Sequence, residues 1–264
     1  MKVFMVDVAK CSGCYNCQIA CKDEHCENDW APYAASQPNS GQFWCEMHQR
    51  EHGQIPKVRV EYWPTFGGQN PAIADYAPDV LMEREDGLQV IMPERAKGRR
   101  DIAEKFEGVY YNEELDIPQA CTGCAHLVDE GKLPHCVDLC ATGALRFGEK
   151  EEFAAEIEEA ETLGAGGDGV PRVYYLNRPH LFIAGDVWDP EDNEIIEGAK
   201  VLLTMPSGEV RQTETDYFGD FYFRRIDEGT YDIAIEAEGF KSIERKGIEL
   251  TGSLNLGDFP LERA

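Results

Sequence analysis

The sequence has no long apolar stretch. None approaches the roughly 20 residues that a membrane-spanning helix needs, so we expect no direct insertion into a membrane. The first ten residues, MKVFMVDVAK, are too short to hold the apolar segment of a secretory signal, and they lead directly to Cys11. We therefore expect a soluble, cytoplasmic chain. Export of the folded chain on the signal of a partner is the alternative.

Positive charge is also scarce. The 264 residues include 25 Lys and Arg but 50 Asp and Glu, which gives a formal net charge of −25 at pH 7. Such a chain repels nucleic acid and anionic membrane surfaces, so we expect neither as a partner. Acidic excess usually serves solubility, and docking to a basic partner is the alternative.

The common signatures of substrate chemistry are missing. The sequence has no phosphate-binding loop, no Gly-rich dinucleotide fingerprint and no Ser–His–Asp arrangement. We therefore expect no substrate-converting site and no catalytic residue in this chain.

Cysteine is absent after Cys140, although ten cysteines occur up to that point. Clustered C-x2-C pairs in a chain without a secretory signal favour metal binding over disulfides. Composition predicts three regions. The first, residues 1–148, contains every cysteine. The second, residues 149–178, is a helix and linker, and the third, residues 179–264, is a separate domain.

The middle region has the pattern of a surface helix. Phe153, Ile157 and Ala160 recur at helical spacing among glutamates, and a Gly-rich stretch at 164–169 ends the pattern. The helix and linker are expected to pack back on the first domain.

The third region shows the period of two that is typical of β-strands. Apolar and polar residues alternate around Val201 and Phe221, and turn signals separate the runs. About seven short strands predict an antiparallel β-sandwich. In the turn DYFGD, Asp216 and Gly219 are expected to shape a hairpin, and calcium binding by Asp216 and Asp220 is the alternative.

Eight of the ten cysteines form two groups with metal-ligand spacing. The groups are Cys11, Cys14, Cys17 and Cys21, then Cys121, Cys124, Cys136 and Cys140. The first has the spacing C-x2-C-x2-C-x3-C of bacterial ferredoxins, in which three cysteines hold one [4Fe–4S] cluster and the fourth ligates the other. The second group has the spacing C-x2-C-x11-C-x3-C.

The ferredoxin rule predicts crossed ligation. One cluster takes Cys11, Cys14, Cys17 and Cys140, and the other takes Cys121, Cys124, Cys136 and Cys21. The 99 residues from 22 to 120 are then an insertion into a pseudo-symmetric core. Two zinc sites are the alternative, but the first group is too dense for the usual two C-x2-C pairs per ion. Lys22 and Ala141 stand where a proline usually follows each run.

Three segments resemble the iron–sulfur electron-transfer (beta) subunits of the dimethyl sulfoxide reductase superfamily of molybdoenzymes. They are CSGCYNCQIACKDEH (11–25), CTGCAHLVDEGKLPHCVDLCATGAL (121–145) and PRVYYLNRP (171–179). The third region is similar to Cna-B or carboxypeptidase-regulatory-like sandwiches, on EGAKVLL (197–203) and TETDYFGDFYF (213–223). With that domain attached, the chain resembles the branch of pyrogallol–phloroglucinol transhydroxylase and the catechol dehydroxylases.

The resemblance implies an α+β fold. A pseudo-symmetric bacterial-ferredoxin-like domain with a long insertion is expected first, followed by an all-β immunoglobulin-like sandwich. Such subunits usually carry two further cysteine groups, but the matching segments here are PTFGGQNPAIA (64–74) and AEKFEGVYYNEE (103–114). The resemblance therefore implies that the central cluster or clusters are lost and that two [4Fe–4S] clusters remain.

Several other residues are candidates for a part in the site. Cys26 and Cys45 are expected to be free thiols, with a disulfide or a ligand role as the alternatives. His126 and His135 are candidates to donate hydrogen bonds to cluster sulfur, or else are loop residues. The cations that could offset cluster charge are Lys10, Lys22 and Arg146.

The resemblance implies a redox subunit. Its clusters would relay electrons to or from a large catalytic subunit that carries molybdenum, or tungsten, in a bis-pyranopterin guanine dinucleotide cofactor. The two subunits would form a heterodimer or a higher assembly, with an unidentified electron donor and aromatic polyols as substrates. Alternatives are purely structural clusters in a redox-neutral transhydroxylase, a respiratory molybdoenzyme with another substrate, and a free ferredoxin shuttle. The size of the chain and its sandwich argue against the last.

Overall fold

The computed structural model describes residues 1–82, 84–163 and 169–264. Two compact units are present, which are Met1–Gln49 with Tyr62–Arg178, and Arg50–Glu61 with Pro179–Ala264. The second unit therefore includes a segment of the insertion that the sequence patterns did not assign to it. Apart from Gly169, the Gly-rich stretch predicted at 164–169 lies outside the described residues.

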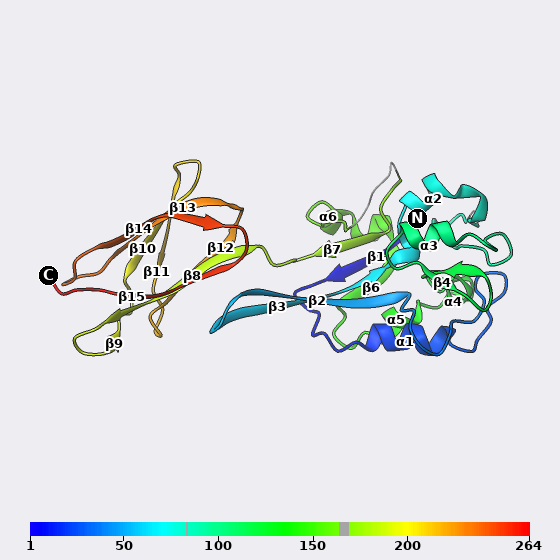
Figure 1. The fold of residues 1–264 in the computed structure, drawn as a ribbon, viewed down its shortest axis with the longest axis horizontal. Helices are drawn as coiled ribbons and strands as arrows, with labels where there is room; N and C mark the ends of the chain where they lie inside the picture. The colour runs from blue at the N-terminus through cyan, green and yellow to red at the C-terminus, as the bar shows by residue number, and fades with distance from the viewer. Residues whose placement is uncertain (83, 164–168) are drawn as a thin grey trace. The chain divides into compact units, whose positions relative to one another are not determined.

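A three-stranded sheet forms the centre of the first unit (Figure 1). β1 (Lys2–Asp7) lies between β6 (Leu145–Glu149), which is antiparallel to it, and β7 (Val173–Leu176), which is parallel. Both faces of β1 are buried because its side chains alternate between two cores. Phe4 and Val6 belong to the core that also contains most of the cysteines, whereas Val3 and Met5 pack elsewhere.

The acidic segment after β6 is helical, as predicted, but its helix is short. A 3₁₀ turn, η3 (Lys150–Phe153), leads into α6 (Ala154–Ile157). Phe153 is buried with Val3 and Met5, and Ile157 and Ala160 pack against this cluster.

Three short helices follow or contain the cysteines. They are α1 (Asn16–His25), α4 (Ala125–Asp129) and α5 (His135–Asp138). α1 packs on α5, which brings the first cysteine group beside the end of the second (Figure 1). Tyr15 and Cys124, directly before α1 and α4, have left-handed backbone with φ of 62° and 49°. Each left-handed residue turns the chain sharply from a cysteine loop into a helix.

The insertion contains short elements around its own apolar core. Its elements are β2 (Cys45–Gln54), β3 (Lys57–Phe66), η1 (Gly67–Gln69), α2 (Ala72–Tyr76), η2 (Pro78–Val80), α3 (Arg100–Lys105), β4 (Tyr110–Asn112) and β5 (Ile117–Gln119). Ile73, Phe106 and Val109 lie in one buried cluster. These three residues come from the segments 64–74 and 103–114, so apolar packing joins these two parts of the insertion.

The second unit contains a β-sandwich of eight strands, where about seven were predicted. The strands are β8 (Leu181–Asp189), β9 (Glu194–Ile195), β10 (Lys200–Thr204), β11 (Val210–Glu214), β12 (Asp220–Ile226), β13 (Gly229–Glu236), β14 (Ile243–Leu250) and β15 (Leu254–Pro260). One sheet has the order β11-β10-β13-β14 and the other β12-β8-β15, with β9 paired to β8. Val201 and Leu203 face one shared core with Phe221 and Phe223, as their alternation predicts.

One strand pair departs from the predicted antiparallel arrangement. β15, the last strand of the sandwich, pairs in parallel with β8, the first strand. Local alternation carries no information about strand direction, so the sequence pattern could not reveal this pair.

The turn predicted at Asp216 is present, but the prediction that it forms a hairpin is wrong, because it connects β11 to β12, which belong to different sheets. The Asp216 carboxylate accepts hydrogen bonds from the backbone N–H groups of Phe218, at 2.9 Å, and Asp220, at 3.0 Å, and Gly219 has a φ of 77°. The carboxylate of Asp220 contacts Lys57 Nζ at 2.8 Å. The calcium alternative is therefore not supported, since both carboxylates have other partners.

Candidate metal centre

Cys11, Cys14, Cys17 and Cys140, called the first set below, line one small cavity. Val6, Met47 and Leu145 also line it, so apolar side chains surround the sulfur atoms. Cys17 is buried, Cys11 and Cys140 are partly buried, and Cys14 is exposed. Cys140 thus lies with the three cysteines of the N-terminal loop, although about half the chain separates them in sequence.

Cys21, Cys121, Cys124 and Cys136, called the second set, are all buried. Burial, followed by the charges of the other three members, raises the pKa of Cys21 well above its usual value. Cys21 is therefore a neighbour of the second cysteine group rather than of the loop that precedes it. α1 carries Cys17 and Cys21 four residues apart, and the two sulfurs take part in different sets.

Backbone donors point at sulfur in both sets. The N–H of Leu145 donates to Cys140 Sγ and the N–H of Gly123 donates to Cys121 Sγ, each at 3.3 Å. Gly13, between Cys11 and Cys14, has a φ of +66°, and a Cβ there would lie 2.6 Å from the ring of Tyr62. The loop of the first set therefore needs glycine both for its backbone and for its close contact with Tyr62.

The chemistry of the donors fits a bound cationic cluster. Burial raises the pKa of Cys11 and brings that of Cys121 to about 12, so these groups without a cation would remain thiols at neutral pH. A bound metal reverses this balance, because it stabilises thiolates directly. Among residues 1–82, 84–163 and 169–264, no three Cys, His, Asp or Glu side chains converge closely enough to hold a single metal ion.

His126 and His135 do not point their rings at sulfur, which corrects the interpretation that they donate to the clusters. His126 Nε2 lies 2.9 Å from one Glu24 oxygen, and His135 Nδ1 lies 2.6 Å from the other. Glu24 follows Cys21 by one helical turn, so it lies on the same face of α1 and reaches both histidines. His135 still contributes a backbone N–H to Cys124, which lowers the pKa of that thiol against the larger effect of burial.

Sequence reasoning missed His25. Its side chain is almost fully buried, at 1% exposed, and its Nε2 atom lies 3.7 Å from Cys124 Sγ. Burial lowers the pKa of His25 to about 3, so the ring is neutral. The available signal was position, because His25 is four residues after Cys21 on the same helix.

The three expected cations have other partners. Lys10 pairs with Asp7 at 3.3 Å, and Arg146 forms a two-pronged ion pair with Glu156. Lys22 donates to backbone carbonyls over residues 38–42. Burial lowers the pKa of Lys22, and the negative charges of Cys26 and Cys21 oppose this effect only in part.

Cys26 and Cys45 form no disulfide, so that alternative is wrong, and the choice between a free thiol and a ligand role stays a prediction. Cys26 Sγ donates to Asn39 Oδ1 at 2.8 Å. Cys45 is buried beside Cys17 of the first set and Cys136 of the second, and hydrogen bonding to these sulfurs raises the pKa of Cys45.

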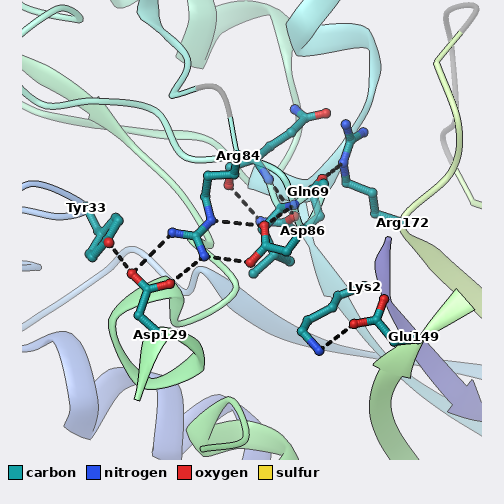
Figure 2. Close-up of polar contacts among 11 residues, drawn as sticks. Lys2, Tyr33, Gln69, Arg84, Asp86, Asp129, Glu149 and Arg172 are labelled. Atoms are coloured by element: carbon teal, nitrogen blue, oxygen red, sulfur yellow. Dashed lines mark hydrogen bonds and ion pairs between the residues drawn. The ribbon is translucent and has the colours of Figure 1, made fainter. Parts of the chain in front are cut away.

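Polar contacts from the insertion reach the loops of the second set, and Figure 2 shows those of Arg84. Gln69 Nε2 donates to the carbonyl oxygens of Cys121 and Gln89, each at 2.9 Å. Arg84 pairs with Asp86 and also reaches Asp129, at the end of α4, at 2.8 Å. Through Gln69 and Arg84, the insertion thus positions Cys121 and α4.

The remaining evidence comes from likeness to known proteins. Residues 69–150 match the model of the 4Fe-4S dicluster domain family, and residues 183–262 match that of the carboxypeptidase regulatory-like domain. No helix in the part of the chain that the structure describes is long and apolar enough to cross a membrane.

Relatives match over most of the chain. The pyrogallol hydroxytransferase small subunit of Pelobacter acidigallici is 35% identical over 251 residues, which cover 89% of this chain and 90% of that one. The anaerobic dimethyl sulfoxide reductase of Escherichia coli (strain K12) has a subunit that is 30% identical over 187 residues, covering 68% of this chain and 86% of that subunit. This chain therefore belongs to the iron–sulfur electron-transfer subunits of the dimethyl sulfoxide reductase superfamily of molybdoenzymes, in the branch that includes the pyrogallol hydroxytransferase small subunit.

Proposed function

We propose that this chain holds two [4Fe–4S] clusters and relays electrons to or from a large molybdenum or tungsten subunit that converts aromatic polyols. The first set would ligate one cluster and the second set the other. The observation that carries this proposal is the cavity lined by Cys11, Cys14, Cys17 and Cys140, since two remote segments meet there. The buried neighbourhood of Cys21 supports the reciprocal exchange.

The residues of this chain would hold and shield the clusters. When bound, a [4Fe–4S] cluster supplies one-electron transfer. The eight cysteines provide thiolates, the backbone N–H groups of Leu145 and Gly123 stabilise ligand sulfur, and apolar neighbours such as Met47 exclude water. We propose no substrate-converting site here, so the chemistry would take place on the larger subunit.

Substrate and partner follow from the family rather than from the geometry. The relative that matches over 89% of this chain is named for hydroxyl transfer on pyrogallol, which supports catechol dehydroxylation or phenol transhydroxylation as the reaction of the complex. A bis-pyranopterin guanine dinucleotide cofactor is proposed for the catalytic subunit only. The assembly would be at least a heterodimer.

Paired cysteine variants test the crossed assignment. Cys21→Ser combined with Cys121→Ser removes two ligands from one proposed cluster, so we expect about four of eight iron atoms per chain to remain. Cys140→Ser combined with Cys121→Ser removes one ligand from each proposed cluster, so we expect less iron to remain than in the first pair. Cys26→Ser is the matched control and should keep the iron content of the natural chain.

If the second paired variant kept more iron than the first, the crossed assignment would be contradicted. If each cluster used one contiguous cysteine group, Cys121 and Cys140 would share a cluster and their paired variant would retain the greater iron content. Iron and sulfide are to be measured on the complex purified anaerobically, because exposed Cys14 makes the first set sensitive to oxygen.

A structural role for the clusters is the second candidate. The hydroxytransferase name of the relative favours it, because hydroxyl transfer between two phenols is redox-neutral overall. In that case the two sets would stabilise the first unit, and no electron would pass through them during turnover.

A further inference from the structure

Helix α1 presents three chemically distinct side chains on one face. Cys21, Glu24 and His25 are at positions i, i+3 and i+4, which lie one above the other on a helix. Cys21 belongs to the second set, Glu24 holds two histidine rings, and His25 lies against Cys124. This helix therefore supplies both a ligand and the polar surroundings of the same set.

The position of the His25 ring is fixed by aromatic contacts. Its centroid lies 4.7 Å from that of Trp44 and 5.5 Å from that of His126, the latter edge to face. Trp44 is 1% exposed, so the ring has no room to turn towards solvent. His25 Nε2 lies 3.7 Å from Cys124 Sγ, within the range of an N–H···S hydrogen bond.

The surroundings of the ring select one tautomer. His25 Nδ1 is buried and has no hydrogen-bond partner among the described residues. A proton on Nδ1 would bury an unsatisfied donor and would aim the lone pair of Nε2 at a negatively charged sulfur. A proton on Nε2 gives a charge-assisted hydrogen bond and leaves only an acceptor unsatisfied.

We propose that His25 donates Nε2–H to the sulfur of Cys124 and thereby raises the reduction potential of the cluster held by the second set. This inference rests on the proposed ligand assignment. Hydrogen bonds to ligand sulfur are one means by which a protein tunes cluster potential. The donor stabilises the reduced site more than the oxidised site, because the reduced site carries one more negative charge.

Glu24 explains why His25 is the ring that donates. Its two carboxylate oxygens engage His126 and His135, and the side chain of Glu24 is only 12% exposed. These two rings are therefore oriented towards Glu24, and His25 is left as the ring beside sulfur. His25 acts through Cys124, so it is a positioning residue rather than a ligand.

The test is a redox titration of the purified complex, followed by electron paramagnetic resonance. His25→Phe keeps an aromatic ring without a donor, and His25→Gln keeps a donor. Phe should make reduction of one cluster about tenfold less favourable, a shift of ~59 mV to lower potential for one electron, whereas Gln should shift it less. Thr142→Val is the matched control, because Thr142 Oγ1 lies 3.8 Å from Cys140 Sγ in the first set. It should leave the cluster affected by His25→Phe unchanged.

A second measurement uses the natural sequence and does not depend on how variants fold. Histidine labelled with ¹⁵N in the imidazole ring alone, which leaves the backbone N–H of His135 unlabelled, should give a weakly coupled nitrogen signal in pulsed resonance of the reduced complex, and His25→Phe should lose that signal. Unchanged potentials in His25→Phe at full iron content, or no coupled histidine nitrogen in the natural complex, would overturn the inference alone. An iron content of the natural complex well below eight per chain would instead contradict the two-cluster proposal, and the inference with it.

Discussion

At the scale of single residues, two features that cysteine spacing does not reveal restrict which residues the cysteine loops can accept. One is backbone conformation, since Gly13 and Gly143, both near the first set, have φ of +66° and +64°. The other is space, because a Cβ on Gly13 would collide with Tyr62, whereas a Cβ on Gly143 would meet no atom within 4 Å. Alanine substitutions at the two glycines can therefore distinguish the effect of backbone strain from the effect of crowding.

Gly13→Ala should lower the iron content of the first set. The left-handed backbone alone costs a non-glycine residue about 1–2 kcal/mol, and this cost applies equally to Gly143→Ala. Only Gly13→Ala also displaces Tyr62 or the loop. We expect Gly143→Ala to keep about eight iron per chain and Gly13→Ala to keep closer to four. Equal iron contents in the two variants would show that the contact with Tyr62 has no effect on the site.

Spacing predicts which cysteines are candidate ligands, but not which residues surround them. C-x2-C patterns are local, so Cys11 and Cys121 stand out in the sequence. His25 does not, because its contact with Cys124 joins residues 99 positions apart. His126 and His135 seemed better candidates because they are close to cysteines in the sequence, yet their rings bind Glu24.

At the scale of elements, segment Arg50–Glu61 packs with strands of the sandwich. Lys57 Nζ contacts the carboxylates of Asp186 on β8 and Asp220 on β12, and its side chain is 5% exposed. Burial would lower the pKa of Lys57, but its hydrogen bonds to the two carboxylates outweigh that effect and the pKa is raised. The stabilisation is therefore present below the ordinary pKa of lysine and is lost as the pH rises through the raised value.

Lys57→Met should destabilise the second unit by about 1–3 kcal/mol at pH 7. This loss of free energy of unfolding is smaller than that expected for a fully buried ion pair, because the side chains of Asp186 and Asp220 are 27% and 26% exposed. Without the cation, the two carboxylates repel each other, so the loss should shrink as the pH falls through the pKa of Asp220, which burial raises. Urea unfolding followed by Trp188, the one tryptophan of this unit, measures the effect.

Lys241→Met is the control for Lys57→Met. Lys241 pairs with Glu262 at 3.2 Å, but their side chains are 62% and 78% exposed, so the change should have little effect. An equal loss in both variants, or a loss in Lys57→Met that does not depend on pH between 4 and 7, would contradict this account.

Segment Arg50–Glu61 also marks a limit of sequence reasoning about elements. The strands of the sandwich could be predicted because their alternation is local and strong. The residues HQREHGQIPKVRVE, from 48 to 61, are mostly polar and lie within the insertion, so nothing local assigns part of them to the second unit. Likewise, the apolar cluster of Ile73, Phe106 and Val109 depends on contacts between segments that are far apart in sequence.

At the scale of the whole molecule, the order of the regions could be predicted from composition. The cysteine-containing part precedes the β-rich part, and the matched families follow the same order. The reaction could not be predicted in this way, because composition carries no information about a substrate and we propose that the reaction takes place on another subunit. The remaining question is whether electrons pass through the two sets.

Rapid-freeze paramagnetic resonance during turnover of the purified complex tests this claim most directly. Our account predicts that signals of reduced clusters appear and decay at least as fast as the complex turns over its phenolic substrate. Clusters that stay oxidised throughout turnover, at a full content of eight iron per chain, would contradict electron relay and would favour a structural role for both sets.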